Sequence, residues 1–282
     1  MTKQNSNLLG KTKLAFIGCD VMAESIVAGL LRQKLVESNQ IVASHPRANR
    51  REELSTKYGI EVFEHNAEAV RFLSENNSII VLCFKPQRLN GVLEDLKDVV
   101  LPSHLVVSII AGATIKTISE ALKNQLVVRT MPNTPSQIGA GMTAWTCSGG
   151  VAEDQKQQIK LLLTALGKEI YVDTENMIDM ATALSATGPT YIFMMMEALT
   201  DAGVHMGFSR EVSKDLVQQT MLGSTLFAIE SNKHPAELRN MVTSPGGTSA
   251  AAIYEMEKGT LRTVLSKAVY AAYKRAVELG KK

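Results

Sequence analysis

Residues 14–23 read Leu-Ala-Phe-Ile-Gly-Cys-Asp-Val-Met-Ala. The first four form an apolar run of strand length, and a glycine follows at once. From Met22 to Leu31 the apolar residues recur at helical spacing. A short strand that turns at a glycine into a helix is typical of the start of a doubly wound α/β domain. This stretch therefore decides the expected fold.

Further short apolar runs follow in the first 175 residues, with helical patterns between them. The runs expected as strands are 41–43, 79–83, 105–110 and 126–128, and a charged helix is expected at 50–58. Runs that are apolar throughout are typical of strands buried on both faces of a parallel sheet. The alternation predicts an α/β fold, with a Rossmann-like doubly wound domain over residues 1–175.

The pattern changes near Asn176, where β-branched runs disappear and a helical period takes over. We expect long helices over 191–206, 211–231 and 260–279. These predict an all-helical domain over residues 176–282. Its apolar surface is large for its length, which favours a homodimer through these helices, with a higher homo-oligomer left open. Met194–Met196 are assigned to core or dimer packing.

Composition excludes several classes of protein. Apolar residues make up 45% and charged residues 21%, the net charge is +2, and no basic block is present, so no nucleic-acid partner is expected. Three distant cysteines and scattered histidines predict no disulfide or metal site and a reducing compartment. Without a visible signal peptide or an apolar run of about 18 residues, we expect a cytoplasmic protein with no membrane partner.

The turn after the first strand matches a dinucleotide-binding fingerprint, G-x-G-x-x-G/A, with one departure. Gly18 and Ala23 are in register, but Asp20 stands in place of the middle glycine. A carboxylate about 4 Å from a phosphate would cost about 1 to 4 kcal/mol, depending on the local dielectric. Alternatively, the Asp20 carboxylate caps the helix and fills the anion site itself.

Other candidate groups follow the ends of the remaining strands, where open α/β sheets bind ligands. Ser44, His45 and Arg47 offer a hydroxyl and cations, which favour the 2′-phosphate of an NADP-type cofactor; the alternative is a solvated helix start. The other strand ends carry Phe84-Lys85-Pro86, Ala111-Gly112 and Met131-Pro132-Asn133.

A second anion site is predicted in the helical half, where residues 242–249 read Val-Thr-Ser-Pro-Gly-Gly-Thr-Ser. Gly246 and Gly247 permit positive φ and a close approach of a ligand to the backbone. A helix is expected from Thr248 onward, and its first N–H groups would have no partner in the helix. The alternative is an ordinary capped helix after a loop.

These motifs together resemble the pyrroline-5-carboxylate reductase family. The matching runs occur in order along nearly the whole chain: 16–18, 22–26, 85–86, 111–112, 131–135, 184–185, 188–189, Tyr191, 197–199, 201–204, 234–235, 243–248 and 257–259. The resemblance implies a Rossmann-like domain joined to a helical domain that interlocks with a second subunit. It also implies reduction of a cyclic imine to L-proline by NADPH, with NADH as the alternative cofactor.

The resemblance also assigns residues. The cofactor would be held by Ile17, Gly18, Cys19, Asp20, Val21, Met22, Ser44, His45, Arg47, Asn66, Phe84, Lys85, Pro86, Ala111, Gly112 and Asn133. The substrate would be held by Gly188, Pro189, Ser244, Gly246, Gly247, Thr248 and Ser249. Thr248 and Ser249 are the candidate catalytic hydroxyls beside the ring nitrogen, and no dedicated acid is assigned.

The chain departs from the family pattern in the cofactor turn and near the expected domain boundary. The departures are Asp20, Val21, Phe84, Ala186, Thr187, Thr190 and Ser249. Three interpretations stay open: a reductase with weakened dinucleotide binding, a reductase of a different cyclic imine, and a non-catalytic relative that serves as a scaffold. A hydroxyacid dehydrogenase is disfavoured, because residues 191–206 contain no lysine.

Overall fold

The computed structural model describes residues 9–73 and 78–280. Contacts divide the chain into two compact units, the first made of residues 1–187 with 272–282 and the second of Gly188–Ala271. Residues 176–187 and the end of the last helix thus pack with the first unit. The domains expected from the sequence, 1–175 and 176–282, were defined by a change of sequence pattern and not by contacts. The contact division does not test them, and they stay a prediction.

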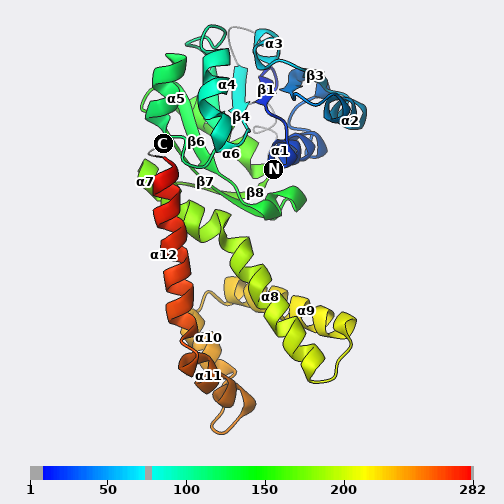
Figure 1. The fold of residues 1–282 in the computed structure, drawn as a ribbon, viewed down its shortest axis with the longest axis vertical. Coiled ribbons are helices and arrows are strands. Elements are labelled where there is room, and N and C mark those ends of the chain that lie inside the picture. The colour runs from blue at the N-terminus through cyan, green and yellow to red at the C-terminus, as the bar shows by residue number, and fades with distance from the viewer. Residues whose placement is uncertain (1–8, 74–77, 281–282) are drawn as a thin grey trace. The chain divides into compact units, whose positions relative to one another are not determined.

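Within the described ranges, the first unit holds an eight-stranded sheet in the order β3-β2-β1-β4-β5-β6-β7-β8 (Figure 1). Neighbouring strands are parallel, except that β6 and β7 are antiparallel. The strands are β1 Lys13–Ile17, β2 Ile41–Ser44, β3 Glu61–Phe63, β4 Ser78–Leu82, β5 Leu105–Ser108, β6 Val127–Met131, β7 Gly141–Cys147 and β8 Gly167–Tyr171. The predicted α/β class is confirmed.

Helices cover both faces of this sheet (Figure 1). They are α1 Val21–Arg32, α2 Ala48–Tyr58, α3 Asn66–Arg71, α4 Leu89–Leu96, α5 Ile115–Leu122, α6 Glu153–Thr164 and α7 Glu175–Ala181. Among the described residues, the unit also contains three short 3-10 helices, Ser38–Gln40, Pro86–Arg88 and Thr134–Ile138, and a π-helical turn, Thr182–Ala186.

The core has two layers because successive strand residues point to opposite faces. In β1, Leu14 and Phe16 pack in the layer covered by α1 and α6. Ala15 and Ile17 pack in the other layer, with residues of α3, α4 and α5. Every residue of β4, β5 and β6 is buried. For β4 and β5 this is the double burial that their apolar runs predict.

The sequence expectations missed three strands. β3 and β8 are edge strands whose polar residues, such as Glu61, Lys168 and Glu169, hide the strand pattern. β7 was missed because it buries hydroxyls, Thr143 and Thr146, where an apolar residue would be expected. The structure also corrects the expected strand 126–128, since β6 continues to Met131.

A buried arginine joins β6 to the helix that follows the sheet. Arg129 is only 1% exposed, and its guanidinium forms ion pairs with Glu175 at 3.0 Å and with Asp179 at 2.5 Å. Glu175 also accepts the backbone N–H of Ile115 at 2.7 Å. The carboxylates of Glu175 and Asp179 on α7 thus connect this helix to β6, and Glu175 also connects it to the start of α5.

The second unit is helical, as predicted. Its elements are α8 Gly188–His205, α9 Arg210–Ser231, α10 Pro235–Met241, α11 Thr248–Lys258 and the first part of α12 Leu261–Leu279. Large apolar side chains stay exposed on these helices, including Phe193, Leu226 and Phe227. Among the helices described, none combines the length and the hydropathy that a membrane crossing requires.

Candidate functional site

A cavity of about 990 Å³ opens in the first unit at the carboxyl ends of β1 to β6. This is the edge of an open α/β sheet where ligands bind, on both sides of the neighbouring strands β1 and β4 at which the strand order reverses. Its lining includes Gly18, Asp20, Val21, Met22, His45, Asn66, Phe84, Lys85, Pro86, Arg88, Ala111 and Met131. Most of the predicted cofactor residues therefore meet in one cavity.

The turn after β1 needs its glycine. Gly18 has φ +80°, and a Cβ at this position would lie 3.0 Å from the Cβ of Phe84. The Gly18 N–H donates to the Ser44 hydroxyl at 3.2 Å, and that hydroxyl donates to Oδ1 of Asn66 at 2.8 Å. The Asn66 amide group is thereby oriented with its NH₂ left without a partner among the described residues.

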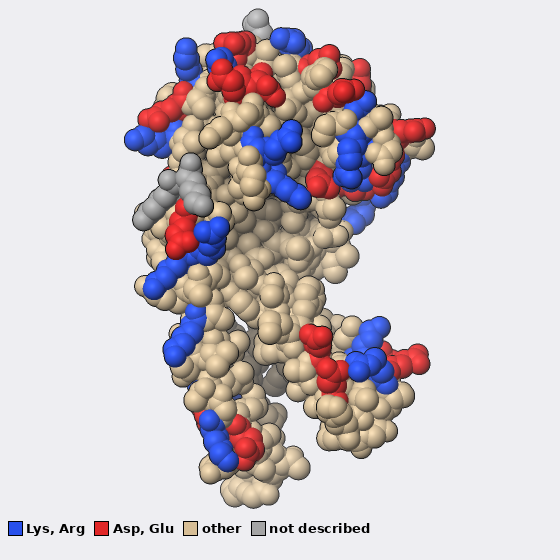
Figure 2. All heavy atoms as spheres, in the orientation of Figure 1, with Lys and Arg blue, Asp and Glu red and all other residues tan. Residues whose placement is uncertain are grey.

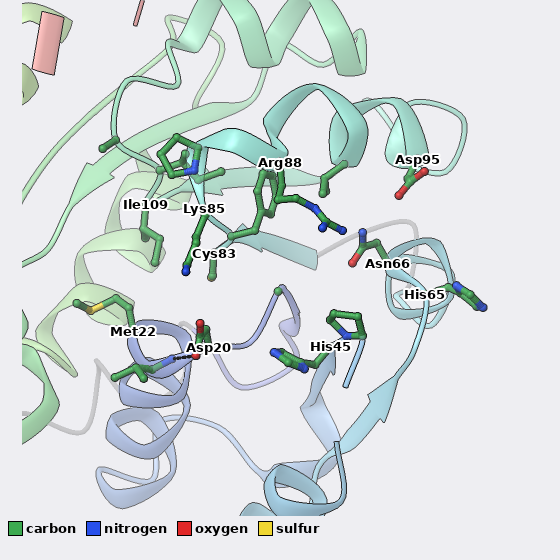
Figure 3. Close-up of a pocket in the computed structure, with 18 of the residues that line it drawn as sticks. Asp20, Met22, His45, His65, Asn66, Cys83, Lys85, Arg88, Asp95 and Ile109 are labelled. Carbon is green, nitrogen blue, oxygen red and sulfur yellow. Dashed lines mark hydrogen bonds between the residues drawn. The ribbon is translucent and has the colours of Figure 1, made fainter. Parts of the chain in front are cut away.

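Asp20 is the N-cap of α1. Its Oδ1 accepts the backbone N–H of Val21 at 3.0 Å (Figure 3). The side chain is exposed and lines the cavity. The two interpretations of Asp20 are therefore compatible, because the same carboxylate caps the helix and places its negative charge in the cavity.

The cavity contains cations that no carboxylate neutralises. The side chains of Lys85 and Arg88 form no hydrogen bond or ion pair within the described part of the chain. Lys85 extends toward Asp20, and Arg88 extends toward Asn66 (Figure 3). On the surface of the first unit, Lys and Arg side chains gather beside a hollow (Figure 2). The site can therefore hold an anion that carries negative charge at two places, one near Lys85 and one near Arg88.

The thiols and the histidine at the base of the site are uncharged. Burial raises the pKa of Cys19 to about 12, and burial raises the pKa of Cys83 well above its usual range. Burial, followed by the charge of Arg47, lowers the pKa of His45. No thiolate nucleophile is therefore present at these positions at neutral pH.

Six predicted cofactor residues do not line this cavity: Ile17, Cys19, Ser44, Arg47, Gly112 and Asn133. Ile17 and Cys19 are fully buried in the core. Asn133 is held by Met142, whose N–H it accepts at 2.9 Å, and it donates to the Ser185 carbonyl at 3.3 Å. Gly112 approaches the end of α12, since a Cβ there would lie 2.7 Å from the carbonyl carbon of Leu279.

Sequence reasoning missed several lining residues, among them Glu64, His65, Arg88, Asp95 and Ile109. Glu64 and His65 follow β3, whose sequence does not read as a strand. Arg88 had a usable signal, because Pro86 begins a tight 3-10 turn shortly after the end of β4, and Arg88 at the end of that turn lines the cavity.

In the second unit, the predicted anion site is an uncapped helix start. Gly246 has φ +69°, and Gly247 is the N-cap of α11, with no side chain closing the end. The N–H groups of Thr248 and Ser249 have no acceptor among the described residues. The Gly247 N–H, predicted as a ligand, donates instead to the Ser244 carbonyl at 3.0 Å and closes the turn.

The remaining predicted substrate residues, Gly188 and Pro189, begin α8. A Cβ on Gly188 would meet nothing within 4 Å, so no packing within the chain requires a glycine there. Among the described residues, no group of three or more His, Cys, Asp or Glu could hold a metal ion.

Two family models match the chain. Residues 175–279 match pyrroline-5-carboxylate reductase dimerisation, and residues 13–112 match NADP oxidoreductase, coenzyme F420-dependent. The pyrroline-5-carboxylate reductase of Synechocystis sp. is 38% identical over 96% of this chain and 99% of its own length. That of Pseudomonas aeruginosa is 39% identical over 95% and 97%.

This chain belongs to the pyrroline-5-carboxylate reductase family. The structure of the Coxiella burnetii reductase superposes with a TM-score of 0.86 at 35% identity, covering 96% of this chain and 99% of that one. The Plasmodium falciparum pyrroline carboxylate reductase, solved with NADP bound, also gives 0.86, at 29% identity over 96% and 98%. The resemblance inferred from the motifs is confirmed, and so is the fold of both halves.

Proposed function

We propose that this protein reduces the cyclic imine 1-pyrroline-5-carboxylate to proline with NADPH as the hydride donor. Relatives named for this activity match nearly the whole chain. The structural observation that carries the proposal is the uncapped start of α11, where two free N–H groups and two hydroxyls are ready for a carboxylate.

The cavity of the first unit fits a nicotinamide dinucleotide. It has apolar walls at Phe84 and Ala111, a glycine turn after β1, and unpaired cations at Lys85 and Arg88. The one misfit is Asp20. A bound reduced nicotinamide would supply the hydride, and these residues would hold the phosphates and exclude water from the apolar wall.

The groups of α11 would orient the substrate. The N–H groups of Thr248 and Ser249 would fix the carboxylate and hence the face of the ring that is exposed to reduction. The hydroxyls of Thr248 and Ser249 form no hydrogen bond with any described residue, so either can donate to the ring nitrogen.

A steady-state assay with the five-membered imine acid, its six-membered homologue and both cofactors tests the proposal. We expect the highest kcat/KM for the five-membered acid with NADPH. A preference for the larger ring would indicate a reductase of a different cyclic imine, and no turnover with any pair would indicate a non-catalytic relative. We expect Thr248→Val and Ser249→Ala to lower kcat/KM about tenfold or more, with Ser231→Ala at the end of α9 as the control.

We also propose a homodimer formed through the helices of the second unit. Phe227 and Ile229 are 50% and 60% exposed in the single chain. On the face that Figure 2 shows, uncharged residues cover most of these helices, beside small groups of charged side chains. Light scattering on wild type and on Phe227→Lys measures this directly. We expect a dimer or larger assembly for wild type and a smaller species for the variant.

A further inference from the structure

The two sides of the cofactor cavity differ in which cations are free. On the β2 side, Arg50 forms ion pairs with Glu24 and Glu53. Arg51 donates to the carbonyl groups of His45 and Pro46 and forms an ion pair with Glu64 at 2.8 Å. Both guanidinium groups are therefore committed to the protein and add little to the binding of an external anion.

The other β2-side groups are equally poor anion ligands. The Ser44 hydroxyl is fully buried and makes both of its hydrogen bonds within the protein. His45 accepts the N–H of Arg47 at its Nδ1, and its pKa is lowered by burial and by Arg47, so it carries no charge at neutral pH. Of the basic residues named on this side, Arg47 is the one whose side chain pairs with no described residue, and it lies outside the cavity lining.

The free guanidinium inside the cavity comes from the opposite side, after β4. Arg88 ends the 3-10 turn that begins at Pro86, and its own backbone N–H donates to the Lys85 carbonyl at 2.9 Å. This turn holds the Arg88 backbone, while its side chain lines the cavity and extends toward Asn66 (Figure 3). Asp95 also lines the cavity but forms no ion pair with Arg88.

Asn66 supplies a second hydrogen-bond donor at the part of the cavity toward which Arg88 extends. Its Oδ1 is occupied by the Ser44 hydroxyl, so its NH₂ group is the part left free. A guanidinium beside a fixed amide NH₂ supplies several N–H donors to one phosphate, and charge-assisted hydrogen bonds of this kind are the strong ones.

We propose that Arg88, together with the Asn66 amide, binds the 2′-phosphate of the cofactor and sets the preference for NADPH over NADH. This rests on the proposed function. In this fold the pyrophosphate lies at the β1 turn and the adenosine ribose at the end of β2. Lys85 extends toward the β1 turn, and Arg88 extends toward the Asn66 end of the cavity (Figure 3). The two cations would therefore contact different phosphates of the cofactor.

Calorimetry on the full-length protein with four probes, 2′,5′-ADP, ADP, NADPH and NADH, tests the proposal without any turnover. We expect Arg88→Gln to weaken binding of 2′,5′-ADP and NADPH at least tenfold and to leave ADP and NADH within about twofold. Asn66→Asp, which keeps the acceptor for Ser44, is expected to act in the same direction. Arg71→Gln, a charge change outside the cavity lining, is the control and is expected to change none of the four.

An equal loss for NADPH and NADH in Arg88→Gln would overturn the proposal, because Arg88 would then act on the pyrophosphate or the adenine. An unchanged affinity for 2′,5′-ADP would overturn it as well. Failure of the wild type to bind any of the four probes would overturn the proposed function together with this inference, whereas failure of the inference alone would leave wild-type binding intact.

Discussion

The Asp20 carboxylate closes the start of α1 by accepting the Val21 N–H at 3.0 Å. In the dinucleotide fingerprint this place belongs to a glycine whose backbone approaches the pyrophosphate. Here the protein supplies its own anion to the helix end and leaves a negative charge in the cavity.

Neutralising Asp20 should tighten cofactor binding. We expect Asp20→Asn, which can still cap the helix, and Asp20→Gly to bind NADPH roughly tenfold more tightly, because repulsion between exposed like charges is relieved. Quenching of protein fluorescence or calorimetry measures this. If neither variant binds more tightly, the charge of Asp20 has no influence on the cofactor. A gain in Asp20→Gly alone would assign the effect to backbone approach.

Removing the Ser44 hydroxyl should lower stability and release the Asn66 amide. The hydroxyl joins the Gly18 N–H to Asn66 and is buried, so Ser44→Ala leaves a buried N–H without its partner. We expect a loss of about 1 to 2 kcal/mol in the free energy of unfolding. Because Asn66 loses the contact that fixes its NH₂ group for the proposed 2′-phosphate position, we also expect weaker binding of NADPH and little change for NADH. An equal loss for NADH and NADPH would instead show that the hydroxyl acts through the Gly18 turn and not through Asn66.

Removing the buried arginine should destabilise the first unit strongly. Arg129→Met leaves Glu175 and Asp179 without their counter-charge, and we expect a loss of about 3 kcal/mol in unfolding by denaturant. Lys116→Gln is the matched control, because its ion pair with Glu120 is at 3.8 Å with both side chains exposed, and we expect less than about 0.5 kcal/mol. Similar losses in the two variants would contradict the assigned role of Arg129.

Stability in acid should depend on Glu24, which joins α1 to α2. Burial raises the pKa of Glu24, but hydrogen bonds from Lys57, Tyr58 and Arg50 outweigh it and hold the pKa at about 2, below the usual 4.5. Because the folded state has the lower pKa, the stabilisation is complete above about pH 4.5 and is lost as the pH falls toward 2.

The Glu24→Gln variant measures that contribution. We expect it to be about 2 kcal/mol less stable than wild type at pH 7, with the difference shrinking between pH 4.5 and 2. Denaturant unfolding at several pH values would show it. A difference that stays constant down to pH 2 would mean that the ionised form of Glu24 is not what stabilises the fold.

Local sequence predicted the elements that depend on local rules. The buried strands β1, β4, β5 and β6, the long helices and the turn before α11 follow from apolar periodicity and from the positions of Gly and Pro. The same rules missed β3 and β8, because an edge strand needs no continuous apolar run and its polar residues resemble those of a loop.

What the sequence by itself determined is the fold class, the family and the set of groups at the strand ends. Only the tertiary structure decided which of those groups are free. Arg50 and Glu24 are 26 residues apart, and Arg129 and Asp179 are 50 apart. No local pattern pairs such residues, because ion pairing depends on which side chains the packed sheet and helices bring within a few ångströms, and the charges left over define the site.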